Sequence, residues 1–196
     1  MSSSPAAAGA LDLARLRELR LEREHYDTIV AHGRRKLEGP YLDEETHERQ
    51  AFGLLAGHIE GDAARTIQVF PLLRNMRHDP RFRPAMDETV NELGVPSTTP
   101  LPRRGWIADP RELLHAHARC EEDGSLIFAN YHMHKVGWEH DPLRDTPTAL
   151  DAALAEGQGV WTLILSLVDP ERPLLRAFYE GMKDREARIL VAGAPL

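Results

Sequence analysis

The stretch Ser125-Leu126-Ile127-Phe128-Ala129-Asn130-Tyr131-His132-Met133-His134 decides how the chain is read. It follows a helix stop at Asp123-Gly124 and is apolar up to its closing histidine pair, which predicts a buried strand. Because side chains alternate along a strand, His132 and His134 should point to the same face. Two imidazoles on one face can bind one metal ion.

A capped helix follows the histidine pair at Pro147-Thr148-Ala149-Leu150-Asp151. Thr148 is the expected N-cap, and Asp151 falls in the first turn of the predicted helix 149–156. A carboxylate arriving from this helix would give a third ligand and leave an open position, as in catalytic zinc sites. Two histidines and one carboxylate also suit non-haem iron or another divalent metal, so ligand types alone leave the metal open.

The composition of the chain argues against several classes of function. The chain has 196 residues, enough for one domain, and a formal net charge of -7, which argues against a large nucleic-acid footprint. Cys120 is the one cysteine, so no disulfide and no cysteine-based zinc site can form within the chain, and a cytoplasmic location is expected. No apolar run approaches the roughly 18–20 residues of a membrane span.

The domain plan follows from alternating helix and strand patterns, which predict an α/β fold. Residues 1–10 are interpreted as a flexible tail and 11–196 as a single domain, in which 11–37 form an additional N-terminal helix, compatible with a homodimer. Strands are expected at 51–59, 65–72, 125–134, 160–167 and 188–191, and a helix from Asp109 to about Glu121. Residues 87–93 suggest a helical turn, 174–182 a short strand or helix start, and 95–104 a substrate flap.

Together these segments resemble the JAMM/MPN+ zinc metalloisopeptidases. In that family an H-x-H closes a strand and P-S-x-x-D opens a helix, which His132-Met133-His134 and Pro147 to Asp151 match closely. Similar stretches are Phe52-Gly53-Leu54-Leu55-Ala56-Gly57, Phe70-Pro71-Leu72-Leu73-Arg74-Asn75 and Trp106-Ile107-Ala108-Asp109-Pro110-Arg111-Glu112-Leu113. The resemblance covers roughly residues 27 to 192 and implies a mixed central β-sheet flanked by helices, with cytidine-deaminase-like layers.

The resemblance also implies roles for individual residues. His132, His134 and Asp151 would be the zinc ligands, and Thr148 would take the place of a serine that stabilises the oxyanion. The implied reaction is hydrolysis of an amide or isopeptide bond through a metal-activated water. The implied substrate is peptide-like, or a ubiquitin-like or sulfur-carrier protein whose tail adds to a strand edge near the metal.

Two departures from the family pattern leave alternatives open. The interval from His134 to Thr148 is longer than the family's usual one. Keeping the usual spacing would make Asp145 the third ligand. We prefer Asp151, because only there do a helix cap, a hydroxyl group and a carboxylate occur together. The family's proton-transferring glutamate is replaced by Gln50, which cannot accept a proton. Glu48 is the candidate base in its place, with Glu139 or His140 as further options.

The substitution at Gln50 also motivates two other function classes. The first is a catalytically reduced binding scaffold of the same fold, which would form a stable complex without hydrolysis. The second is a non-haem metalloenzyme that uses the same two histidines and carboxylate.

Overall fold

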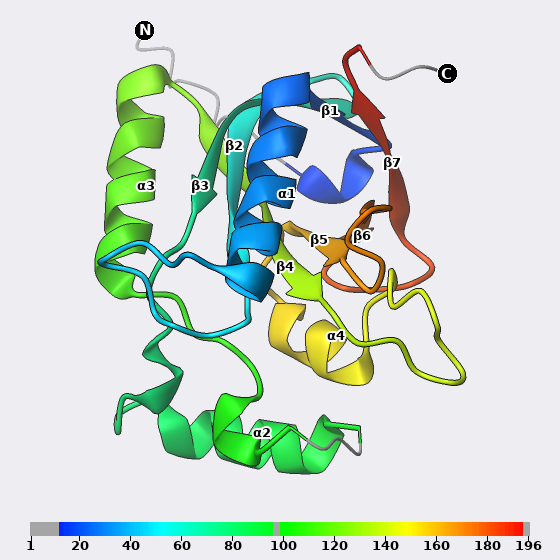
Figure 1. The fold of residues 1–196 in the computed structure, drawn as a ribbon. Helices are drawn as coiled ribbons and strands as arrows, with labels where there is room; N and C mark the ends of the chain where they lie inside the picture. Colours follow the sequence, from blue (N-terminus) through cyan, green and yellow to red (C-terminus); the bar gives the residue numbers. More distant parts are fainter. Residues whose placement is uncertain (1–11, 96–98, 194–196) are drawn as a thin grey trace, which may run out of the picture.

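The computed structural model describes residues 12–95 and 99–193, and these residues form seven strands and four α-helices (Figure 1). The strands are β1 (Glu18–Leu21), β2 (Phe52–Glu60), β3 (Ala63–Pro71), β4 (Leu126–His134), β5 (Trp161–Ser166), β6 (Leu174–Tyr179) and β7 (Glu186–Val191). The helices are α1 (Arg23–Glu38), α2 (Arg83–Leu93), α3 (Pro110–Asp123) and α4 (Ala149–Ala155). Short 3-10 turns lie at Leu13–Arg15, Met76–His78 and Leu101–Arg103. None of the described helices is both long and apolar enough to cross a membrane.

The strands form a closed mixed barrel in the order β1-β3-β2-β4-β5-β6-β7. β1 pairs in parallel with both β3 and β7, β4 pairs in parallel with β5, and the remaining pairs are antiparallel. The prediction of a single α/β domain with a mixed sheet and flanking helices is confirmed. Closure of the sheet into a barrel was not expected, because it depends on β1.

The predicted N-terminal helix over 11–37 is wrong in its first half. Glu18–Leu21 is a strand, and the helix α1 begins only at Arg23. Leucines at three-residue steps suggested a helix, but Leu19 and Leu21 are both buried and alternate with exposed Arg20, which is the period of a strand. Pairing with β3 and β7 overrides the local helical pattern. The predicted tail 1–10 lies outside the described residues.

Several other elements agree with the sequence patterns. β2 and β3 form the expected hairpin, and Asp109 caps α3 by accepting a hydrogen bond from the Arg111 amide. Residues 174–182 contain a strand, β6, and the helical turn expected at 87–93 is part of the longer helix α2. The predicted flap 95–104 is described only in part, since residues 96–98 lie outside the described ranges; its end forms the turn Leu101–Arg103.

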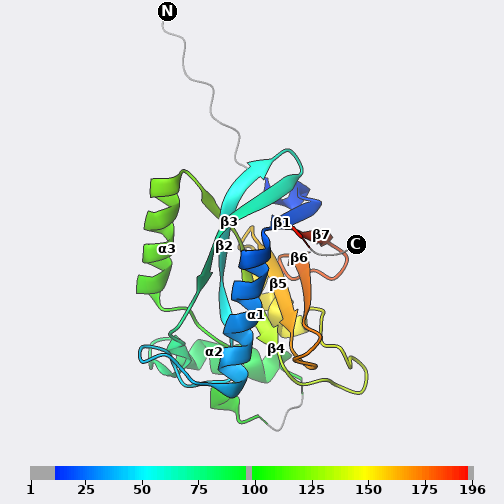
Figure 2. The same cartoon turned by 45° about the horizontal axis from the view of Figure 1, so that its top comes forward.

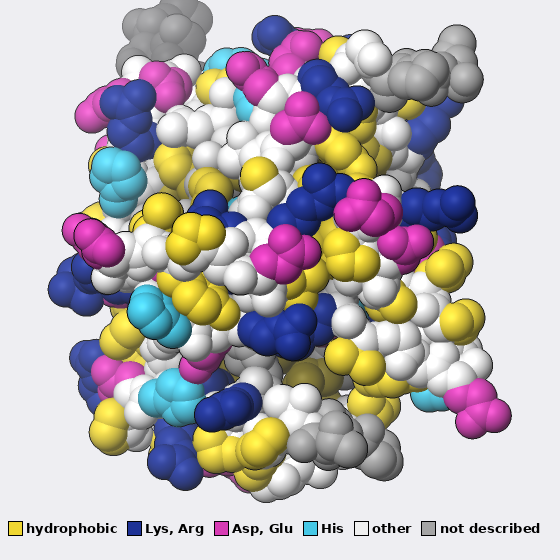
Figure 3. Space-filling model, viewed as in Figure 1, with side chains coloured by type: hydrophobic (Ala, Val, Ile, Leu, Met, Phe, Trp, Pro, Cys, Tyr) yellow, Lys and Arg dark blue, Asp and Glu magenta, His cyan; other side chains and the backbone are white. Residues whose placement is uncertain are grey.

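Helices cover both faces of the central strands (Figures 1 and 2). α1 packs on the face that contains Tyr131 and Met133 of β4, together with Leu163 and Leu165 of β5. A second apolar cluster joins α3, through Ala116 and other residues, to the opposite face of β2 and β3. On the surface over α1, basic and acidic side chains are interspersed rather than gathered into one patch (Figure 3).

The parallel pairing of β4 with β5 positions the candidate site. Parallel neighbours must be joined by a crossover, and here the crossover is a loop followed by α4. Figure 1 shows α4 beside the end of β4, away from α1. Asp151 of this helix is therefore brought to the face of β4 from which His132 and His134 project.

A close backbone approach at Gly53 gives a test of the packing between β2, β3 and β4. A Cβ at Gly53 would lie 2.4 Å from the Phe70 carbonyl oxygen and 2.4 Å from Tyr131 Cε1. Because a backbone carbonyl held in a strand ladder cannot move aside cheaply, we expect Gly53→Ala to lower the free energy of unfolding by about 2–3 kcal/mol. Chemical denaturation measures this loss.

The matched control is Gly61→Ala in the β2–β3 turn, where φ is +68° and no atom lies within 4 Å of an added Cβ. Here only backbone strain opposes alanine, and we expect a loss of about 1 kcal/mol. Equal losses for the two variants would contradict the close packing at Gly53.

Candidate metal centre

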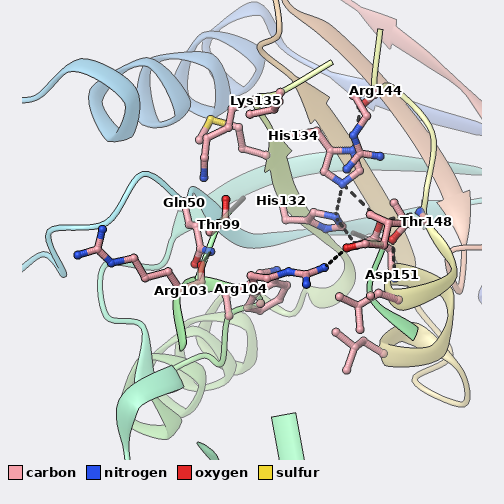
Figure 4. A pocket seen from close by; sticks show the side chains of 18 of the residues that line it. Gln50, Thr99, Arg103, Arg104, His132, His134, Lys135, Arg144, Thr148 and Asp151 are labelled. Carbon is pink, nitrogen blue, oxygen red and sulfur yellow. Dashed lines mark hydrogen bonds and ion pairs between the residues drawn. The ribbon is translucent and has the colours of Figure 1, made fainter. Parts of the chain in front are cut away.

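Three side chains from β4 and α4 converge at one point (Figure 4). The Nε2 atoms of His132 and His134 are 3.2 Å apart. Asp151 Oδ1 is 3.1 Å from His132 Nε2, and Asp151 Oδ2 is 3.4 Å from His134 Nε2. Potential ligand atoms of these three residues all lie within 4.8 Å of one another. The structure thus brings together the two histidines and the carboxylate that the sequence singled out.

Local structure fixes each of the three side chains. The two histidines share a face of β4 because they are two residues apart, while Tyr131 and Met133, which alternate with them, point into the α1 core. Asp151 belongs to a capping box: its Oδ2 accepts a hydrogen bond from the Thr148 amide at 2.6 Å, and its own amide donates to Thr148 Oγ1 at 3.2 Å. The cap therefore orients the carboxylate as well as starting the helix.

The hydrogen bond behind His134 selects its tautomer. His134 Nδ1 lies 2.8 Å from the Arg144 carbonyl oxygen, to which only a protonated nitrogen can donate. In the neutral ring this leaves Nε2 with a lone pair directed at the cluster, which is the arrangement that supports metal-ligating histidines. His132 Nδ1 is buried and has no hydrogen-bond partner among the described residues.

Burial and mutual proximity shift the protonation of the cluster toward ligand-competent forms. Burial lowers the pKa of His134, although the neighbouring Asp151 opposes that shift. Burial would raise the pKa of Asp151, but the facing imidazoles of His132 and His134 outweigh it and hold the pKa well below its usual range. A neutral imidazole and an ionised carboxylate are the forms that bind metals.

The donor set fits a divalent metal ion. Two imidazole nitrogens face each other at 3.2 Å, and a carboxylate oxygen lies near each of them. Burying such a polar group costs free energy unless a cation or a proton is shared among its atoms. Nitrogen and oxygen ligands of this kind suit zinc and also iron(II). Three protein ligands leave room for a further group from solvent or substrate.

The alternative ligand Asp145 lies elsewhere. Its Oδ2 forms an ion pair with Arg176 Nη1 at 3.2 Å, and Asp145 is not part of the three-residue cluster. The longer loop between His134 and Thr148 is therefore accommodated without displacing the capped helix from the histidines. Glu139 and His140, in the same loop, are exposed and do not line the cavity at the cluster.

The candidate base Glu48 is engaged away from the cluster. Glu48 Oε2 accepts a hydrogen bond from Asn75 Nδ2 at 2.7 Å, and Oε1 lies 2.8 Å from His78 Nε2. Gln50 instead lines the cavity, with its amide donating to the Arg103 carbonyl and accepting from Asn75. Of these two side chains, the one that lines the cavity is thus an amide that cannot accept a proton.

The cluster opens into a cavity of about 240 Å³ whose lining was only partly foreseen. Thr148 lines it, and so do four cations, Arg103, Arg104, Lys135 and Arg144 (Figure 4). The indoles of Trp106 and Trp138 line it as well. Asp151 is the one acidic residue among the described lining residues. Nothing in the sequence pattern marked the cations, because two come from residues 103–104 and two from the loop between β4 and α4, and the pairs share no spacing.

Comparison with known proteins gives the fold but no activity. No protein-family profile matches the chain, and no curated protein matches it. The chain is similar to protein DSY2949 from Desulfitobacterium hafniense, whose solution structure gives a TM-score of 0.60 at 24% sequence identity over 90% of this chain and 94% of that one. This similarity supports the architecture of the domain and says nothing about its chemistry.

Metal binding by the cluster is tested by titrating metal-stripped protein with zinc in a competition assay. We expect one equivalent to bind, and His132→Ala or Asp151→Asn to weaken binding by more than about 100-fold, since losing even an outer-shell partner costs 10–100-fold. Asp145→Asn removes the same charge as Asp151→Asn but at the Arg176 pair, and it should leave the affinity unchanged. Undiminished binding by His132→Ala would show that the metal sits elsewhere.

Proposed function

We propose that this protein is a zinc-dependent hydrolase of the JAMM type, with an MPN-like arrangement of layers, that cleaves an amide or isopeptide bond. The observation that carries the proposal is the convergence of His132 Nε2, His134 Nε2 and both Asp151 oxygens beside a cavity. A zinc ion held there would polarise a carbonyl group and lower the pKa of a water molecule, which is the chemistry that amide hydrolysis needs.

The chain's own residues support this reaction in distinct ways. Thr148 Oγ1 accepts a hydrogen bond from the Asp151 amide, so its hydroxyl hydrogen is available to donate to negative charge that develops on a substrate carbonyl. The Arg144 carbonyl holds His134 in the ligating tautomer. Both contacts use backbone groups fixed by the capped helix and its preceding loop.

The site lacks a well-placed side chain for proton transfer. Gln50 occupies the cavity and has no basic group, and Glu48 reaches the cavity only by giving up its contacts with Asn75 and His78. General-base catalysis typically contributes 10²–10⁴-fold to a rate. We therefore expect the protein to be a slow hydrolase, with Glu48 acting only after such a rearrangement.

The proposed substrate is peptide-like, such as a short peptide or the extended tail of a ubiquitin-like or sulfur-carrier protein. The cavity at the cluster is too small for a folded domain and large enough for a residue or two of extended chain. β4 pairs with β2 on one side and β5 on the other, so a tail cannot add to the strand that carries the histidines. The tail should therefore enter the cavity by its end or as a loop.

A second candidate function is a binding scaffold of the same fold with little or no catalysis. The observation that favours it is the amide of Gln50 in the cavity where a carboxylate would serve a hydrolase. A non-haem iron enzyme remains a third candidate, motivated by the same two histidines and one carboxylate.

Activity is tested by incubating zinc-loaded protein with a defined mixture of N-blocked peptides and following cleavage by mass spectrometry. We expect slow, zinc-dependent cleavage that His134→Ala and Asp151→Asn abolish. Gln50→Glu should raise the rate by about 10²–10⁴-fold, because it restores a base beside the cluster. Gln68→Glu adds the same charge on β3, outside the lining of the cavity, and should have no effect.

The outcomes separate the candidate functions. Cleavage by Gln50→Glu but none by the natural chain would favour the binding scaffold. No cleavage by either protein with zinc bound would contradict the hydrolase proposal. Turnover that requires iron and is absent with zinc would favour the third class.

A further inference from the structure

Arg144 is a buried cation whose charge no described side chain fully satisfies. It is 8% exposed, yet its Nε and Nη1 atoms are buried without a hydrogen-bond partner among the described residues. Among the described residues its one ion-pair contact is with Asp141, whose Oδ2 lies 3.6 Å from Nη1, beyond hydrogen-bonding distance, and the charge of Asp151 in the cluster also acts on it. Because burying a guanidinium without such partners is costly, this position needs a reason beyond packing.

The backbone around Arg144 is held in a rare conformation. Its φ is +50°, in the left-handed region that residues with side chains seldom adopt. The Arg144 amide donates to Asp141 Oδ1 at 3.0 Å, its carbonyl accepts from His134, and the neighbouring Leu143 carbonyl accepts from the Ser166 hydroxyl. Such clamped, strained residues gather at binding and catalytic sites.

The guanidinium is also pre-oriented. Its central carbon lies 3.5 Å from the centre of the Trp138 ring, so the planar group stacks on the indole and cannot rotate freely. Arg144 lines the same cavity as the cluster, and Figure 4 shows its side chain beside His134. A planar, fixed guanidinium with unused N–H donors is suited to a carboxylate, which it binds through two parallel hydrogen bonds.

The charges of the cavity also favour a bound carboxylate. Arg103, Arg104 and Lys135 line it with Arg144, against the single carboxylate of Asp151. Arg104 and Lys135 donate to the carbonyls of Val95 and Arg49, and neither forms an ion pair with another described residue, although Glu48 acts on the charge of Lys135. A protein with a net charge of -7 thus concentrates positive charge where a substrate would bind.

We propose that Arg144 binds a free carboxylate of the substrate, so that the bond cleaved lies within about one or two residues of a carboxyl terminus. An extended residue spans roughly 3.5 Å, and the cavity that holds both Arg144 and the cluster is only about 240 Å³. This inference rests on the proposed hydrolase function and names its substrate class: peptides or protein tails that end in a free carboxylate just beyond the scissile amide.

The test compares two probes that differ only at the carboxyl terminus, N-benzoyl-Gly-Gly and its carboxamide. Calorimetry with zinc-loaded protein should show at least tenfold tighter binding of the free acid. Arg144→Gln should remove this preference, whereas Arg172→Gln, which removes the same charge from an exposed turn outside the cavity, should retain it. Preference that survives Arg144→Gln, or equal or absent binding of the two probes to the natural chain, would overturn the inference.

A second measurement does not depend on the variant folding. In the natural chain, the side-chain Nε–H resonance of Arg144 should shift in nuclear magnetic resonance spectra when the acid is added and stay in place with the carboxamide. No shift with the acid would also overturn the inference.

Cleavage of the benzoyl-glycyl–glycine bond by the same samples separates the two proposals. Acid-selective binding through Arg144 without cleavage would contradict the hydrolase and support the carboxylate site. Equal binding and equal cleavage of acid and carboxamide would support the hydrolase and contradict the role of Arg144.

Discussion

The parallel pairing of β4 with β5 is the constraint on which the candidate site depends. The register runs from Ala129 opposite Trp161 to His134 opposite Ser166, so the chain must cross over between the two strands. The face of β4 carrying Tyr131 and Met133 is filled by the α1 core. The crossover helix α4 therefore lies on the other face, where the histidines project, and its first turn delivers Asp151. The alternation of side chains along β4 therefore places Tyr131 and Met133 in the core and His132 and His134 in the candidate site.

Features that depend on local sequence could be predicted, and those that depend on distant pairing could not. The shared face of His132 and His134 follows from strand alternation, and the position of Asp151 follows from a capping box with Thr148. By contrast, Leu19 and Leu21 belong to a strand only because β3 and β7 flank them. The engagement of Glu48 by Asn75 and His78, and the left-handed backbone of Arg144, likewise arise from contacts made across the fold.

The charges of the described residues that line the cavity are mostly positive. One carboxylate, Asp151, is committed to the two histidines, and the position where a base would act carries the amide of Gln50. The remaining charges facing the cavity are positive, and Arg144 among them is both buried and stacked on Trp138. Such an arrangement favours the binding of an anion.

The central claim is that His132, His134 and Asp151 together hold one divalent ion, and X-ray absorption spectroscopy at the zinc edge of the zinc-loaded protein tests it most directly. The account predicts a first shell of nitrogen and oxygen atoms at about 2.0–2.1 Å, with outer-shell scattering from two imidazole rings. Replacing either histidine by alanine should remove the scattering of one ring. A spectrum without imidazole scattering, or one that neither replacement changes, would contradict the account.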